Sequence, residues 1–169
     1  GELRVGVIPT VAPYLLPDVI TQFLLKYPKI KLQIWEYTTE RITQELKSGN
    51  VDCGILATPL LDQSMIEVPL FYETFVAYVS PNSTLYQKKL LNPDDISTDR
   101  LWLLNEGHCM RGQVLNICNY KHNHGISSSF EYNTGSVETL KRMVDINSGI
   151  TILPELSIMN YDEDQMAHV

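Results

Sequence analysis

The residues best able to carry chemistry lie in one short segment, LNEGHCMR at residues 104–111, and Cys118 follows nine residues after Cys109. Cysteines spaced in this way are most often small buried apolar side chains without a chemical role. Here His108 and Arg111 flank Cys109, and neighbouring positive charge favours the thiolate, which is the reactive form. Cys109 is therefore the candidate reactive thiol, with Cys118 as a second thiol that can trap its oxidised form as a disulfide.

The expected local structure adds to this reactivity. An apolar strand over residues 101–104 gives way to a helix-compatible run over residues 111–120, and Cys109 lies at the junction. Backbone N–H groups at the start of a helix lack intrahelical partners and carry the positive end of the helix dipole. Both effects would stabilise a thiolate at Cys109.

The spacing of the two cysteines predicts a switch. Along a helix, the nine steps from Cys109 to Cys118 rise about 13.5 Å and turn about 900°, which places the side chains on opposite faces. A disulfide needs Cα atoms about 5.5 to 6 Å apart. The bond could form only if the segment unwinds, so oxidation would change the structure as a sensor requires.

Polar residues also follow the first two expected strands. Thr10 comes after the first strand, and the pair Thr38 and Thr39 comes after the second. In an open α/β sheet, ligands bind at the carboxyl ends of strands. The same threonines could simply cap helices, and the sequence leaves both alternatives open.

Other kinds of chemistry lack support. His122 and His124 lie near Cys118, but no further ligand completes a tetrahedral set at a usual spacing, so we expect no metal site. We also expect no cofactor, because the sequence contains no phosphate-binding, dinucleotide-binding or nucleophile-elbow motif.

Composition narrows the class of protein. A hydrophobic content of 44% suits a folded domain, and no apolar run is long enough to span a membrane. The net charge of −7 argues that this chain does not itself contact nucleic acid. Three cysteines without a C-x-x-C motif and no secretory signal favour reduced thiols and a cytoplasmic location. Cys53 lies in an apolar strand and is expected to be an inert, packed thiol.

The hydrophobic pattern predicts a first α/β lobe over residues 1–79. Strands are expected at residues 3–8, 30–34 and 51–57, the last fully buried in a parallel sheet. A helix ending before Pro28 and another ending at Gly49 separate them. Alternation of strand and helix is typical of α/β domains.

A second α/β lobe is expected over residues 80–169. After a strand at residues 72–79, the turn sequence at 81–83 predicts the crossing between lobes. Further elements are a helical turn, two strands, a helix capped by Ser136 and a last strand, and they are expected at residues 92–96, 101–104, 127–132, 136–148 and 150–153. The acidic tail at residues 161–164 is expected to be mobile.

Three motifs, IPT at residues 8–10, GSVETL at 135–140 and SGITILP at 148–154, resemble the effector domain of LysR-type transcriptional regulators. They occur in the family's order and span nearly the whole chain. The specific motif is EGHC at residues 106–109 followed by Cys118, which resembles the hydrogen-peroxide sensors of that family. The resemblance implies two Rossmann-like lobes similar to type II periplasmic binding proteins, with the redox segment over residues 104–120 in the second lobe.

The resemblance also implies residue roles. Cys109 matches the peroxidatic cysteine and Cys118 the resolving one. The positions that match the polar surroundings of the reactive thiol are Thr10, Thr39, Gly107, His108 and Arg111. One position departs from the family pattern, because Gly112 follows the arginine where an acidic residue is usual.

The function implied by the resemblance is redox sensing rather than enzymatic turnover. Peroxide would oxidise Cys109, Cys118 would resolve the product, and refolding would alter the packing of a homodimer or tetramer. DNA would be bound only by a helix-turn-helix domain before Gly1, and further elements after about Val169 would return to the first lobe. Expected partners are RNA polymerase and cellular thiol reductants.

Two alternatives stay open. The chain could be a LysR-type effector domain that binds a small metabolite between its lobes, with cysteines that take no part. It could also be a solute-binding protein for transport. The absence of a signal sequence counts against transport, and the cysteine motif counts against both alternatives.

Overall fold

The computed structural model describes residues 1–60, 62–96, 100–105, 109–117 and 134–169. The chain divides into two compact units, Gly1–Tyr72 and Glu73–Val169. Each has its own sheet, so the expectation of two α/β lobes is confirmed.

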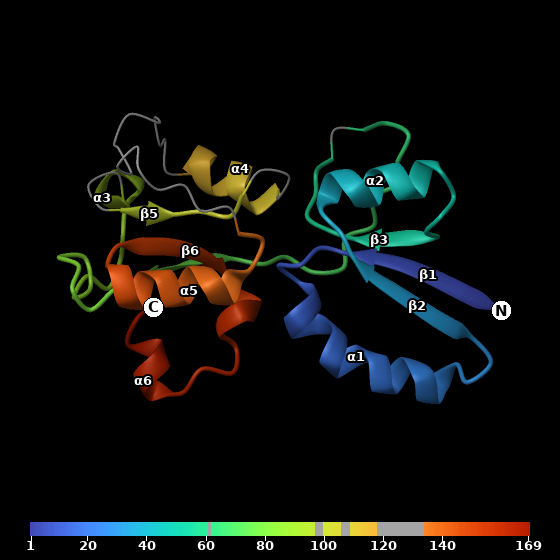
Figure 1. The fold of residues 1–169 in the computed structure, drawn as a ribbon, viewed down its shortest axis with the longest axis horizontal. Coiled ribbons are helices and arrows are strands. Elements are labelled where there is room, and N and C mark those ends of the chain that lie inside the picture. Colours follow the sequence, from blue (N-terminus) through green and yellow to red (C-terminus); the bar gives the residue numbers. More distant parts are fainter. Residues whose placement is uncertain (61, 97–99, 106–108, 118–133) are drawn as a thin grey trace. The chain divides into compact units, whose positions relative to one another are not determined.

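The first unit is a three-stranded parallel sheet with the strand order β2-β1-β3. Its elements in chain order are β1 (Glu2–Val7), α1 (Ala12–Lys26), β2 (Lys31–Glu36), α2 (Thr39–Lys47) and β3 (Cys53–Ile55). The two helices lie on opposite sides of the sheet (Figure 1). This alternation brings the carboxyl ends of all three strands to one edge.

Glycines allow α2 to approach the sheet closely. Ile42 on α2 is completely buried. A Cβ atom at Gly6 in β1 would lie 3.0 Å from the Ile42 side chain, and one at Gly54 in β3 would lie 2.5 Å from it. Larger residues at either position would push the helix away from the sheet.

The third strand is shorter and more exposed than its apolar sequence predicts. It spans Cys53–Ile55 and forms one edge of the sheet. The expectation that Cys53 is packed in the core is wrong, because this residue is exposed. An apolar run predicts a buried strand only when neighbours cover both of its sides, and an edge strand has a neighbour on one side only.

The second unit contains a sheet with the order β4-β6-β5. Its strands are β4 (Phe75–Val79), β5 (Leu101–Trp102) and β6 (Ile150–Pro154), with β4 antiparallel and β5 parallel to β6. The described helices are α3 (Pro93–Ile96), α4 (Cys109–Ile117), α5 (Val137–Asn147), the 3-10 helix η1 (Glu155–Ile158) and α6 (Glu163–Met166). The strand expected at residues 127–132 lies outside the described residues.

Helix α5 follows its sequence signals closely. Ser136 accepts a hydrogen bond from the Thr139 N–H and so caps the helix. Leu140 and Val144 are spaced one turn apart and are fully buried in the core of this unit. The helix ends at Asn147, before Gly149 adopts a positive φ of 105°.

The boundary between the units differs from the one expected at residues 79 and 80. Strand β4 pairs with β6 along its whole length, from Phe75 opposite Pro154 to Val79 opposite Ile150. It therefore belongs to the second unit, and the division falls between Tyr72 and Glu73. The turn at residues 81–83 lies inside the second unit.

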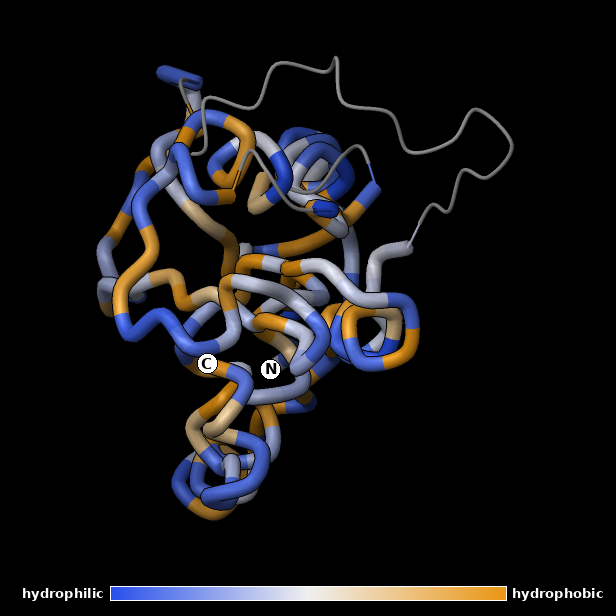
Figure 2. The backbone as a smooth tube through the Cα atoms, turned by 90° about the vertical axis from the view of Figure 1, so that its left-hand side faces the viewer, coloured by the Kyte–Doolittle hydropathy of each residue, from blue (hydrophilic) through white to orange (hydrophobic). Residues whose placement is uncertain are grey.

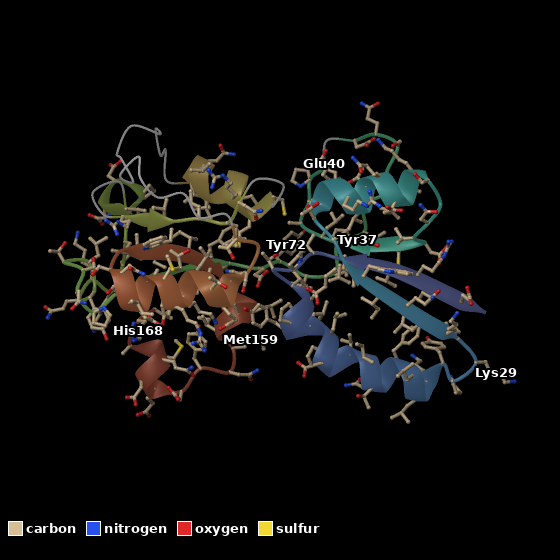
Figure 3. All side chains as sticks on the ribbon, viewed as in Figure 1. Lys29, Tyr37, Glu40, Tyr72, Met159 and His168 are labelled. Carbon is tan, nitrogen blue, oxygen red and sulfur yellow. The ribbon has the colours of Figure 1, made fainter. Side chains whose placement is uncertain are left out.

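The acidic tail is ordered, contrary to expectation. Asp162 and Gln165 form a reciprocal capping box at the start of α6. Beyond the helix, the His168 ring stacks on Tyr78 with centroids 5.1 Å apart, and the His168 carbonyl accepts a hydrogen bond from the Val79 N–H. Figure 3 shows His168 beside the body of the second unit.

Hydrophobic and hydrophilic residues alternate along the backbone (Figure 2). Such alternation is typical of helices and strands that cover a core on one side. In the described part of the chain, no helix has the length and apolar character needed to cross a membrane.

Candidate functional site

Cys109 is the first residue of helix α4 and is a free, half-buried thiol. Two side chains anchor this helix in the core, because Met110 and Val114 are 5% and 1% exposed and lie one turn apart. The buried pair fixes the start of the helix and leaves Cys109 accessible. The predicted placement of Cys109 at a helix start is confirmed, with the N–H groups of the first turn beside it.

Arg111 connects the helix to the strand before it. Its Nη1 atom donates a hydrogen bond of 2.8 Å to the carbonyl of Leu104, which is 1% exposed and follows β5. The guanidinium has five donors, and this bond uses one of them. Arg111 therefore links the two ends of the segment from residue 104 to residue 111, which contains Cys109.

Asn105 is a residue that the sequence analysis missed. Its backbone N–H donates to the carbonyl of Thr134, which ties the start of the cysteine loop to the chain before α5. Its side-chain oxygen is buried and has no hydrogen-bond partner among the described residues. A buried acceptor without a donor destabilises the fold. A hydrogen-bond donor at this position would therefore be stabilising. No pattern in the sequence distinguishes this asparagine from an ordinary strand end.

The structure separates the roles of the threonines in the first unit. Thr38 caps α2, because its hydroxyl accepts a hydrogen bond from the Arg41 N–H. The hydroxyl of Thr39 does not cap the helix; it is buried and without a partner in the described residues. Thr10 is 5% exposed and follows β1.

Thr10 and Thr39 share one edge of the first sheet. Thr10 follows β1 and Thr39 follows β2, and these strands are parallel neighbours. Their carboxyl ends therefore meet at the same edge, where ligands bind in folds of this type. Thr38 caps the helix, so the hydroxyl of Thr39 is not needed for capping. It is available for the other alternative, which is ligand binding.

Several predicted site residues cannot be placed. Gly107, His108 and Cys118 lie outside the described residues, as do His122 and His124. The described helix continues to Ile117. The segment from Cys109 to the residue before Cys118 is therefore helical, which is the condition for the predicted switch.

The described residues leave space beside Gly112. A Cβ atom there would meet no described atom within 4 Å. Packing against the described residues therefore does not explain why glycine stands where the family usually has an acidic residue.

Cys53 is a poor candidate for the same chemistry. Partial desolvation and, secondarily, the neighbouring Asp52 carboxylate raise the pKa of its thiol, even though the residue as a whole is exposed. Asp52 itself is paired with Arg4 at 2.7 Å. A raised pKa lowers the thiolate fraction, so Cys53 should react more slowly than an ordinary thiol.

No group of three or more potential metal ligands occurs within the part of the chain that the structure describes. Around the start of α4, the described residues of the second unit offer a thiol, an arginine and an amide oxygen. These groups suit chemistry at sulfur and hydrogen bonding to a small polar molecule.

Comparison with known proteins gives the family context. Residues 1–168 match the LysR substrate binding domain. The chain is 34% identical over 160 residues to the hydrogen peroxide-inducible genes activator of Haemophilus influenzae, covering 95% of this chain and 52% of that protein. It is 35% identical over 158 residues to the DNA-binding transcriptional dual regulator OxyR of Escherichia coli K12, covering 94% of this chain and 51% of that protein.

Solved structures show a similarity to the same group of proteins. A crystal structure of an OxyR mutant from Porphyromonas gingivalis is similar with a TM-score of 0.87 and 32% identity, covering 99% of this chain and 76% of that chain. The reduced OxyR of the same species gives a TM-score of 0.85 at 32% identity, covering 99% of this chain and 75% of that chain.

The chain spans about half the length of the curated relatives it matches. Those relatives are named as regulators of genes rather than as enzymes. The architecture is that of a type II periplasmic-binding-like fold. With a match over residues 1–168, this chain belongs to the family of LysR substrate-binding domains.

Proposed function

We propose that this chain is the peroxide-sensing regulatory part of a LysR-type transcription factor. The observation that carries the proposal is the free, half-buried Cys109 at the first residue of α4. The names of the relatives, which include hydrogen peroxide-inducible genes activators, support the same function.

The proposed chemistry begins with the Cys109 thiolate attacking one oxygen of hydrogen peroxide. An S–O bond forms, the O–O bond breaks, and the departing hydroxide takes a proton to become water, which leaves a sulfenic acid. The Cys118 thiol then attacks the oxidised sulfur, an S–S bond forms, and a second water leaves. Cellular thiol reductants reset the switch by reducing the disulfide.

The polar residues would bind and orient the peroxide. In this proposal Arg111 and His108 favour the thiolate, and Thr10, Thr39 and Gly107 supply hydrogen bonds to the oxidant. The buried hydroxyl of Thr39 supports this role because it has no partner within the described residues. A small polar ligand such as peroxide would satisfy it.

Formation of the disulfide would then change the structure of helix α4. Helix α4 spans Cys109–Ile117, so a bond from Cys109 to Cys118 requires at least part of that helix to unwind. The refolded segment would alter the packing of a homodimer or tetramer. A separate N-terminal domain would bind DNA, contact with RNA polymerase would follow, and the protein would act in the cytoplasm.

The test is oxidation of the reduced protein by stoichiometric peroxide, followed by thiol titration and mass spectrometry. Cys109→Ser should abolish peroxide consumption, because a hydroxyl is a far poorer nucleophile at neutral pH. Cys118→Ser should leave the first oxidation intact and allow sulfenic acid to accumulate.

Cys53→Ser is the matched control and should behave as the wild type, because Cys53 has a raised pKa. Loss of the first oxidation in Cys118→Ser would reverse the assigned roles. Unchanged peroxide consumption in Cys109→Ser would remove the basis of the proposal.

A second candidate function is favoured by the same unpartnered Thr39 hydroxyl. It could belong to a metabolite site, as the family description of a substrate-binding domain suggests. The Cys109→Ser variant distinguishes redox sensing from metabolite binding. Gene regulation that still responds to its inducer in that variant would favour a metabolite, and loss of the response would favour redox sensing.

A further inference from the structure

The corner between α5 and β6 contains a backbone conformation that only glycine adopts easily. Ser148 has a φ of 64° and a ψ of 172°. For a residue with a Cβ atom this conformation is strained, and it persists only where the surrounding structure holds it. Ser148 is the one non-glycine residue with a positive φ in the described part of the chain. Contacts from other elements must therefore keep the corner in this form.

Trp102, the last residue of β5, supplies one of these contacts. Its indole Nε1 atom donates a hydrogen bond of 2.8 Å to the Ser148 carbonyl. The indole is itself well fixed, because Trp102 is 7% exposed and the Arg100 guanidinium lies 5.7 Å from the centre of its ring. The Trp102 carbonyl accepts a further bond of 2.9 Å from the buried hydroxyl of Thr151. A fixed donor thus sets the direction of the Ser148 carbonyl, and with it the ψ angle of Ser148.

The residues after Ser148 pack tightly against the start of β5. A Cβ atom at Gly149 would lie 2.3 Å from the Arg100 carbonyl oxygen, so no larger residue fits there. The same carbonyl accepts a hydrogen bond of 2.8 Å from the Ile150 N–H. These contacts fix Gly149 and Ile150 in place. The orientation of the Ser148 carbonyl is left to the indole bond.

Strand β5 also leads to the cysteine helix. The carbonyl of Leu104, two residues after Trp102, accepts the hydrogen bond from Arg111 in α4. Trp102 pairs with Thr151 in β6. A displacement of β5 would therefore act on the indole bond as well as on the start of α4.

We propose that Trp102 is a latch that holds Ser148 in its strained conformation and makes the corner between α5 and β6 a two-state element. While the indole bond is present, Ser148 keeps its positive φ and α5 ends at Asn147. When β5 moves and the bond breaks, the strained backbone relaxes, Ser148 takes a negative φ, and the last turn of α5 loosens. Coupling between distant parts of a protein needs an element with two discrete arrangements, and this corner would be one between β5 and α5. The inference concerns the reduced protein and does not depend on peroxide chemistry.

Nuclear magnetic resonance of the reduced wild-type chain tests the latch without any variant. The other tryptophan, Trp35 in β2, is a reference, because its indole makes no hydrogen bond to the described residues. The Trp102 indole N–H should exchange with solvent about tenfold or more slowly than that of Trp35. The one-bond Cα–Hα coupling of Ser148, which is sensitive to the sign of φ, should report a positive value.

Trp102→Phe removes the indole donor and keeps an aromatic ring. In this variant the coupling of Ser148 should change to that of a negative φ. The amide of Asn147, in the last turn of α5, should exchange about 3- to 10-fold faster relative to the amide of Leu140 in the first turn, the range for loss of one hydrogen bond. Trp35→Phe is the matched control and should leave both readouts unchanged. Circular dichroism establishes that each variant is folded.

A double-mutant cycle measures the strain itself. Ser148→Gly relieves the strain only if Ser148 is strained to begin with, so it should favour the folded second unit at least about fivefold more in the wild type than in Trp102→Phe. Glycine also makes the unfolded chain more flexible, but this effect is the same in both backgrounds and cancels. Ser148→Ala keeps the Cβ atom and should show no such difference. The slowest-exchanging amides of the second unit report its unfolding.

Four outcomes would overturn the latch. Two need no variant to fold, namely an indole N–H of Trp102 that exchanges as fast as that of Trp35, and a negative φ at Ser148 in the wild type. The third is a Trp102→Phe variant in which Ser148 keeps its positive φ or Asn147 keeps its exchange rate. The fourth is an equal effect of Ser148→Gly in both backgrounds. Each leaves the peroxide proposal untouched, because no oxidant is used.

Discussion

At the scale of single residues, Arg111 has two effects that can be separated. In the proposed function its charge would favour a thiolate at Cys109, and its bond to the Leu104 carbonyl holds the first turn of α4 in place. Arg111→Met loses both, so closure of the disulfide from preformed sulfenic acid should accelerate about 3- to 10-fold, since one such bond contributes about 0.5 to 1.5 kcal/mol. Rapid quenching with a thiol-alkylating reagent and mass spectrometry would measure this step.

Arg111→Lys is the matched variant, because lysine keeps the charge in a compact ammonium group with N–H donors but loses the planar fork of the guanidinium. Its closure rate should lie between those of the wild type and Arg111→Met. Slower closure in Arg111→Met than in the wild type would show that Arg111 supports the disulfide form rather than the helical one.

At the scale of elements, the stability of α4 should control the speed of the switch. Gly112 is an exposed residue inside α4, and a Cβ atom there would meet no described atom within 4 Å. Glycine is about 0.8 to 1.0 kcal/mol less favourable than alanine in a helix interior. Gly112→Ala should therefore slow disulfide closure about fourfold, while the first oxidation keeps its rate because Cys109 is unchanged. Faster closure in Gly112→Ala would mean that the helix does not unwind before the bond forms.

At the scale of the whole molecule, oxidation should change how subunits pack. Moving a two-state equilibrium from 1:99 to 99:1 takes about 5.5 kcal/mol, and a disulfide typically contributes about 2 to 4 kcal/mol. Oxidation could thus supply much of the bias without a bound ligand. Small-angle scattering of reduced and oxidised forms of a complete regulatory domain should give different profiles at the same oligomeric state. Superimposable profiles, with the disulfide confirmed by mass spectrometry, would mean that the signal does not travel through subunit packing.

The sequence alone predicts the local elements and the position of Cys109 at the start of a helix. Ser136, Thr38 and Gly49 mark helix ends through capping and a positive φ, which are interactions between near neighbours in the chain. The start of α4 near Cys109 is predicted by a different signal, the change from an apolar strand at residues 101–104 to a helix-compatible run. Family motifs add the two-lobed fold, because they occur in order over nearly the whole chain.

Features that depend on contacts between residues far apart in the sequence are visible only in the folded structure. The boundary lies before β4 because that strand pairs with β6, and the tail is ordered because His168 stacks on Tyr78. Cys53 is exposed because β3 is an edge strand, a position that its apolar sequence does not reveal. Hydrophobic periodicity reports which side of an element is apolar. It does not report which distant element covers that side, and this choice is made only when the chain folds.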